Sequence, residues 1–71
     1  MSIDKLKRII WRLREQYGDE RVYKLKDVRK AIMYEVGIDD RTLSKYTKKL
    51  KEAGLIERIS RWYLKDIAGM I

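Results

Sequence analysis

Three stretches of this sequence carry apolar residues at intervals of three and four positions, and a glycine follows each stretch. Such intervals match the 3.6-residue repeat of an α-helix, so each stretch gathers its apolar side chains on one face. Glycine readily takes the left-handed backbone conformation that ends a helix, which makes Gly18, Gly37 and Gly54 the expected stops. The predicted helices cover residues 3–17, 26–36 and 41–53.

The segment after the third predicted helix is rich in β-branched and aromatic residues, in two short runs on either side of residues 60–61. Side chains of this kind favour strands, so residues 55–65 are predicted to form a β-hairpin with residues 60–61 as its loop. Residues 66–71 then form a short tail. Before the second helix, residues 22–23 are expected to contribute a short extended segment, little more than a bridge.

The length of the chain limits it to one domain. A chain of 71 residues buries only about 60 % of the surface that its unfolded form exposes, so it cannot divide its core. We therefore expect residues 1–71 to form a single α+β domain, mainly α, with three helices and a C-terminal β-hairpin. Tyr23, Trp62 and Tyr63 are expected to complete the core between the hairpin and the helices.

Cysteine and histidine are both absent. The chain thus lacks a thiolate nucleophile, the usual general base and the usual imidazole metal ligand, so we expect no enzyme, no metal, no cofactor and no small-molecule ligand. The adjacent carboxylates of Asp39 and Asp40 are expected to cap the third helix. No apolar run reaches the roughly 18 residues that a membrane span needs, and no signal peptide is recognisable. The expected location is cytoplasmic, in association with the nucleoid.

Positive charge is concentrated in one part of the chain. Eighteen basic and 11 acidic side chains give a net charge of +7, and charged residues make up 41 % of the sequence. A composition so rich in charge and poor in amides is typical of thermophilic proteins, but that bias would raise both signs together. Residues 41–61 contain seven basic and two acidic side chains and so carry +5 of the +7. This clustering predicts a polyanionic partner.

The clustered charge coincides with a motif. Residues 37–50 are GIDDRTLSKYTKKL, and residues 51–58 continue as KEAGLIER. The turn, the capped helix that opens Thr-Leu-Ser and the exit Leu-x-x-x-Gly-Leu-Ile resemble the winged helix-turn-helix family of prokaryotic and archaeal transcription regulators. The resemblance extends over residues 22–65. It implies that the third helix lies in the major groove of double-stranded DNA, that the hairpin forms the wing, and that the protein is a sequence-specific transcriptional regulator.

The outward side chains of the third predicted helix are of the types that bind base edges and phosphates. The candidates for base contacts lie near its start and are Arg41, Thr42, Ser44 and Lys45. The candidates for phosphate contacts lie further along this helix or around the second one: Lys48, Lys49, Lys51, Lys24, Lys26 and Lys30. The candidates in the wing are Arg58, Ser60 and Arg61. Solvated surface charge is the equal alternative for the lysines of the second helix and for the wing.

The spacing of like charges on the third helix favours DNA contact over a solvated face. Arg41, Lys45 and Lys49 repeat every four residues, and each such pair repels by about 0.2 to 0.5 kcal/mol. A helix with a purely structural role gains nothing from this repulsion. Two alternatives stay open: a winged-helix module that docks an acidic protein partner, and an architectural protein that holds DNA non-specifically through its phosphates.

Trp11 does not belong to the apolar face of its own predicted helix. At 100° per residue it points about 140° away from Leu6, among charged side chains. Small chains often gain core by oligomerising, and tryptophan is enriched at interface centres, so we expect a homodimer. The candidate interface residues are Trp11, Ile67, Met70 and Ile71. The alternative is that the apolar tail covers Trp11 within one chain.

The Trp11→Ala variant tests this dimer. Loss of the indole should shift the sedimenting species from dimer to monomer, because the variant removes the largest apolar side chain of the expected interface. Analytical ultracentrifugation measures the change. A variant that sediments as a dimer identical to the parent would exclude an interface built on the first helix.

Overall fold

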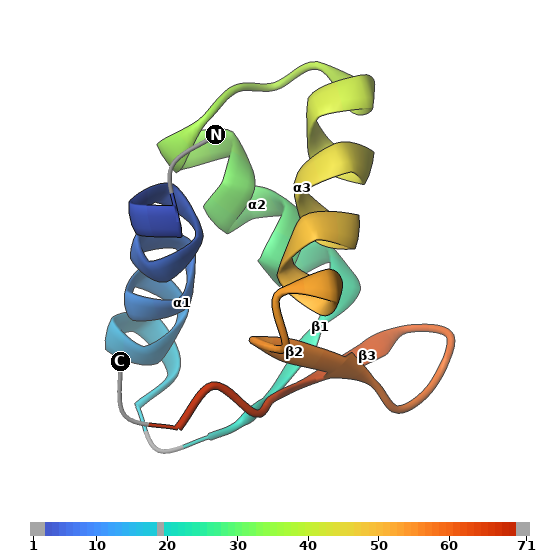
Figure 1. The fold of residues 1–71 in the computed structure, drawn as a ribbon. Helices are drawn as coiled ribbons and strands as arrows, with labels where there is room; N and C mark the ends of the chain where they lie inside the picture. Colours follow the sequence, from blue (N-terminus) through green and yellow to red (C-terminus); the bar gives the residue numbers. More distant parts are fainter. Residues whose placement is uncertain (1–2, 19, 70–71) are drawn as a thin grey trace.

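The computed structural model describes residues 3–18 and 20–69, which form three helices and a three-stranded antiparallel sheet. The elements follow in the order α1 (Ile3–Tyr17), β1 (Val22–Lys24), α2 (Leu25–Glu35), α3 (Asp40–Glu52), β2 (Ile56–Arg58) and β3 (Tyr63–Asp66). Figure 1 shows α2 between α1 and α3, with the sheet at one end of the helices and the β2–β3 loop projecting beyond α3. The chain is therefore a mainly helical α+β fold, as the sequence predicted.

The helices lie where the apolar periodicity placed them, with small shifts at their ends. The first coincides with the predicted range, whereas α2 and α3 each begin and end one residue earlier than predicted. The start of α3 moves because Asp39 is its N-cap: its Oδ1 accepts a hydrogen bond from the backbone N–H of Arg41 at 3.0 Å. At the other end Gly54 has a φ of 74°, the conformation expected of a helix stop.

The sheet has one strand more than the predicted hairpin. The order is β1-β3-β2, so β3 is the central strand and pairs with both neighbours. Tyr23 of β1 lies opposite Leu64, and Glu57 of β2 lies opposite Lys65. The short segment expected at residues 22–23 is a three-residue strand and so more than a bridge, because β3 offers a second edge on which it can form.

The loop of the hairpin is longer than predicted. It comprises residues 59–62 instead of residues 60–61, and the backbone N–H groups of Ile59 and Ser60 both donate to the carbonyl of Tyr63, at 3.2 and 3.3 Å. A two-residue hairpin turn needs positive φ values, which no non-glycine residue among those described adopts. The wider loop avoids this conformation and explains the absence of glycine and asparagine.

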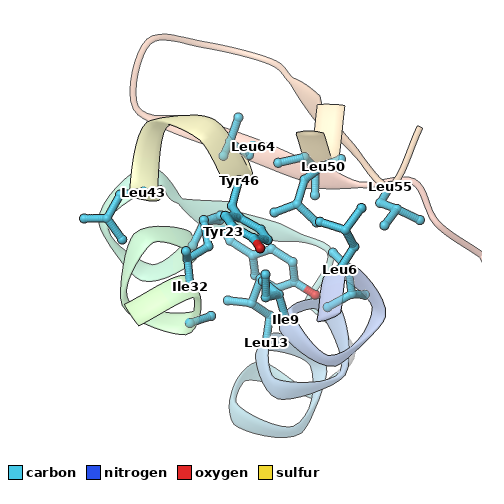
Figure 2. Packing of buried hydrophobic residues seen from close by; sticks show 14 residues of the cluster. Leu6, Ile9, Leu13, Tyr23, Ile32, Leu43, Tyr46, Leu50, Leu55 and Leu64 are labelled. Atoms are coloured by element: carbon cyan, nitrogen blue, oxygen red, sulfur yellow. The ribbon is translucent and has the colours of Figure 1, made fainter. Parts of the chain in front are cut away.

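The core combines one stripe from each helix with the inner face of the sheet (Figure 2). Its buried hydrophobic residues are Leu6, Ile9, Ile10, Leu13, Tyr23, Val28, Ala31, Ile32, Leu43, Tyr46, Leu50, Leu55, Ile56 and Leu64. Tyr23 fills the centre as expected. Trp62 and Tyr63 do not: their exposed fractions are 62 % and 42 %. Alternation along β3 turns Leu64 inward and Tyr63 outward, and Trp62 belongs to the loop, so the prediction that they complete the core was wrong.

Asp66 is the buried charged residue of the described chain, only 1 % exposed, although the sequence placed it in the tail. It is the last residue of β3, and its carboxylate receives a bidentate hydrogen bond from Arg14 of α1, at 2.8 Å from Nε and 3.1 Å from Nη2. The hydroxyl of Tyr23 and the backbone N–H of Ala68 also donate to it, at 3.1 and 3.0 Å. Arg14 donates further to the carbonyl of Gly69 at 2.6 Å. Every lone-pair direction of the buried carboxylate is thus used.

These contacts change the pKa values of Asp66 and Tyr23. Burial alone would raise the pKa of Asp66, but the hydrogen bonds from Arg14, Ala68 and Tyr23 outweigh burial and hold that pKa below its ordinary value. Burial, and then the charge of Asp66 and the hydrogen bond to it, raise the pKa of Tyr23 to about 12. The ionised carboxylate and the neutral phenol are therefore the forms that the fold stabilises.

The Asp66→Asn variant measures this network. It should lower the free energy of unfolding at neutral pH by about 1 to 3 kcal/mol, because an amide replaces the charged acceptor of the network and Arg14, whose side chain is 27 % exposed, loses its ion partner. Since folding lowers the pKa of Asp66, its contribution is complete above the ordinary value of 3.8 and disappears as the pH falls through the folded-state pKa. The free energies of unfolding of the parent and the variant, measured with urea, should therefore converge in acid. A difference that stays constant from neutral pH into strong acid would contradict this account.

Candidate nucleic-acid interface

The orientation of α3 determines which cations reach the surface. Leu43, Tyr46 and Leu50 are buried against the other elements, so the opposite side of the helix faces outward. Asp40 in its first turn and Lys49 and Lys51 in its last turn interact favourably with the helix dipole. Thr47 is partly buried, and its hydroxyl donates to the carbonyl of Leu43 at 2.7 Å, which leaves Ser44 as the freer hydroxyl on the neighbouring turn.

A groove of about 320 Å³ runs between α3, the start of α2 and the hairpin; we call it the α3 groove. Its polar lining is Arg29, Ser44, Thr47, Lys48, Lys51, Arg58 and Arg61. Leu25 and Leu64 form its apolar floor. Five cations from three elements therefore surround one concave surface, and no carboxylate lines it. A surface of this kind attracts an extended polyanion.

The cations of the α3 groove are weakly neutralised by the rest of the described chain. Lys48 lies 3.8 Å from Glu52, and both side chains are exposed. Arg29 lies 3.6 Å from Asp40, whose side chain is almost fully exposed. Exposed ion pairs of this length contribute little to stability, so a phosphate can replace either carboxylate at a small cost in free energy. Arg58 donates from Nε to the carbonyl of Ser60 at 3.3 Å, a contact that holds its side chain along the loop.

A second groove of about 280 Å³ lies beside the first, and the two share Leu25 and Arg29. It is lined by Lys24, Leu25, Lys26, Arg29, Trp62 and Tyr63; we call it the aromatic groove. It contains no carboxylate either. The two grooves form one continuous basic surface over α2, α3 and the hairpin.

The structure brings together only part of the predicted site. Of the predicted residues, those in the two grooves are Ser44, Lys48, Lys51, Arg58, Arg61, Lys24 and Lys26. Those outside both grooves are Arg41, Thr42, Lys45, Lys49, Lys30 and Ser60. On α3 the division follows the helical repeat: Lys45 and Lys49 lie about 100° and 140° from Ser44, on the flank away from the hairpin. Arg41, about 60° from Ser44, lies between the two flanks.

Sequence reasoning missed Arg29 and the outward position of Trp62. Arg29 is central, because it lines both grooves from α2. Its position one residue after buried Val28 gave no signal, since only the packing of α2 against α3 and the hairpin brings it to the groove. The signal for Trp62 was its place beside the predicted turn, where side chains more often face solvent.

The candidate dimer residues are exposed where the structure describes them. Trp11 on α1 is 45 % exposed and Ile67 after β3 is 44 % exposed. Met70 and Ile71 lie outside the described residues. The homodimer stays a prediction.

Comparisons of the chain with protein-family models, with curated proteins and with solved structures found no significant match. No helix within residues 3–18 and 20–69 is long and apolar enough to cross a membrane. The same residues contain no group of three or more acidic side chains placed to hold a metal ion. The interpretation of this surface therefore depends on its own geometry and charge.

The cap of α3 can be tested separately from its cations. The Asp39→Ala variant should lower the free energy of unfolding by about 1 kcal/mol, because it removes the acceptor for the Arg41 backbone N–H. Asp40→Ala is the matched control, with the same charge change one residue along, and should cost about 0.5 kcal/mol or less. Urea unfolding at neutral pH measures both. Equal losses in the two variants would show that Asp39 acts only through its charge.

Proposed function

We propose that this chain is a winged helix-turn-helix protein that binds duplex DNA and regulates transcription. The observation that carries the proposal is the α3 groove, in which five cations from α2, α3 and the hairpin face one concave surface without a carboxylate. Phosphates dominate the affinity of proteins for DNA, and lysine and arginine are the groups that bind them. Arg29, Lys48 and Arg58 supply one such group from each element.

The order of the elements supports this proposal. A helix-turn-helix motif joins two helices by a short turn, and here four residues, 36–39, connect α2 to α3. The β2–β3 hairpin follows and projects beyond α3, in the position that a wing would occupy (Figure 1). In this arrangement α3 is the recognition helix. Its 13 residues extend over about 20 Å, enough to lie along a major groove that is about 12 Å wide.

The two ends of α3 suggest different roles in the complex. Near the start of the helix, Arg41, Ser44 and Lys45 are exposed and carry groups that hydrogen-bond to base edges. Further along, Lys48 and Lys51 face the hairpin together with Arg58 and suit the phosphates of one strand. The guanidinium of Arg41, which makes no ion pair among the described residues, is the candidate for a guanine.

The test is a titration of random-sequence duplexes at two salt concentrations, followed by sequencing of the bound fraction. The parent should bind tightly at low salt and enrich one motif. The Lys48→Gln/Lys51→Gln variant should bind more weakly and reduce the slope of log K against log salt by about two units, roughly one for each phosphate contact. Neutralising two cations outside the groove should change the slope far less.

The matched control for this test is Lys5→Gln/Arg8→Gln on α1, which removes the same charge from exposed positions that line neither groove. An equal effect of the two double variants would mean that net charge alone drives binding. Salt-sensitive binding without an enriched motif would identify an architectural protein. A parent that binds no duplex at either salt would refute the proposal and leave the module that docks an acidic protein.

A further inference from the structure

The aromatic groove contains more apolar surface than phosphate binding requires. Trp62 and Tyr63 line it together with the cations Lys24, Lys26 and Arg29. In the β1–β3 ladder Lys24 lies directly opposite Tyr63, and both side chains are exposed, so an amine and a phenol ring share one outward face of the sheet. Phosphates are bound by cations and hydrogen-bond donors, so these large exposed rings are not explained by phosphate binding.

Backbone and side-chain contacts hold Trp62 in place. Its carbonyl accepts a hydrogen bond from the N–H of Leu25 at 2.7 Å, which ties the hairpin loop to the first residue of α2. The guanidinium carbon of Arg61 lies 5.3 Å from the centroid of the indole, within the range of a cation–π contact. The backbone at Trp62 is therefore tied to α2 and Arg61 contacts its ring, although 62 % of the residue is exposed.

This combination of groups matches an unpaired nucleotide. Stacking on an aromatic ring requires the flat face of a base, and within a duplex the faces of the bases are stacked on one another, so only their edges reach the grooves. An unpaired base offers a free face to tryptophan or tyrosine, and its phosphates need nearby cations. Lys24 and Lys26 supply those cations, and Arg29 continues into the α3 groove, where the duplex is proposed to lie.

We infer that the aromatic groove binds an unpaired base next to the duplex, so that the preferred ligand is double-stranded DNA with a single-stranded extension. This inference rests on the proposed function and names the substrate class of the same surface. In the complex the base stacks on Trp62, Tyr63 borders it, and the phosphates of the extension lie at Lys24 and Lys26. The stacking site tolerates any base, because every base has a π-face.

Fluorescence anisotropy with the full chain tests the inference on three DNAs that share one duplex. One is blunt, one carries four unpaired thymidines at its 3′ or 5′ end, and one carries four abasic residues in the same place. The thymidine extension of at least one polarity should bind about fivefold or more tightly than the abasic extension, since both have the same phosphates and only the first can stack.

Variants of the hairpin identify the stacking residue. Trp62→Ala should abolish the preference for thymidine over abasic extensions and leave the affinity for blunt duplex within about twofold. Trp62→Phe should restore most of the preference, because the phenyl ring still stacks. Tyr63→Ala should reduce it, and Ile59→Ala, an exposed apolar residue of the same loop outside both grooves, should not change it.

The outcomes separate this inference from the proposed function. Equal affinity for thymidine and abasic extensions, or a preference that survives in Trp62→Ala, overturns the inference while duplex binding stands. Failure of the parent to bind any of the three DNAs overturns both. Each variant should unfold thermally at the same temperature as the parent. This control shows that a lost preference for the thymidine extension does not come from loss of the fold.

Discussion

The buried carboxylate of Asp66 is the point at which three distant parts of the chain meet. Arg14 lies 52 residues before it on α1, and Tyr23 lies 43 residues before it on β1. A buried charge is unfavourable unless it is paired and hydrogen-bonded, so the carboxylate forces these partners into one arrangement. Because Asp66 ends the central strand, the same contacts determine where β3 lies against α1. Both β1 and β2 pair with β3, so this network links the whole sheet to α1.

The site depends on this arrangement through the hairpin. Arg58 and Arg61 reach the α3 groove only because β3 carries the loop past the end of α3. On the helical side, the burial of Leu43, Tyr46 and Leu50 determines which flank of α3 faces that loop. The core therefore selects Ser44, Lys48 and Lys51 for the groove and excludes Lys45 and Lys49, although all five residues are exposed or half-buried.

The sequence predicted well those features that depend on local pattern and poorly those that depend on distant pairing. Apolar periodicity and glycine stops located all three helices within one residue, because both signals act within a few turns. The pairing of the three-residue β1 as a third strand was not predicted, since a strand so short exists only through its pairing with β3. No local pattern marks Asp66 as buried, because its partner is 52 residues away. For the same reason the cationic segment was predictable, but its division between two flanks and its completion by Arg29 were not.

The clustered cations of the surface repel one another, and this repulsion reduces the stability of the fold. Arg41, Lys45 and Lys49 make two like-charge contacts along α3, worth about 0.2 to 0.5 kcal/mol of repulsion each, and the groove brings Arg29, Arg58 and Arg61 close to further lysines. The network at Asp66 is the other charged feature of the fold, and replacing its carboxylate is expected to cost about 1 to 3 kcal/mol. The Asp66 network lies beside α1 and β1, away from both basic grooves. It therefore holds these elements together without neutralising the cations of the grooves. The Asp66 network and the basic surface thus lie in different parts of the molecule. This separation leaves the cations of the basic surface with only weak, exposed ion pairs within the described chain, those of Arg29 with Asp40 and of Lys48 with Glu52.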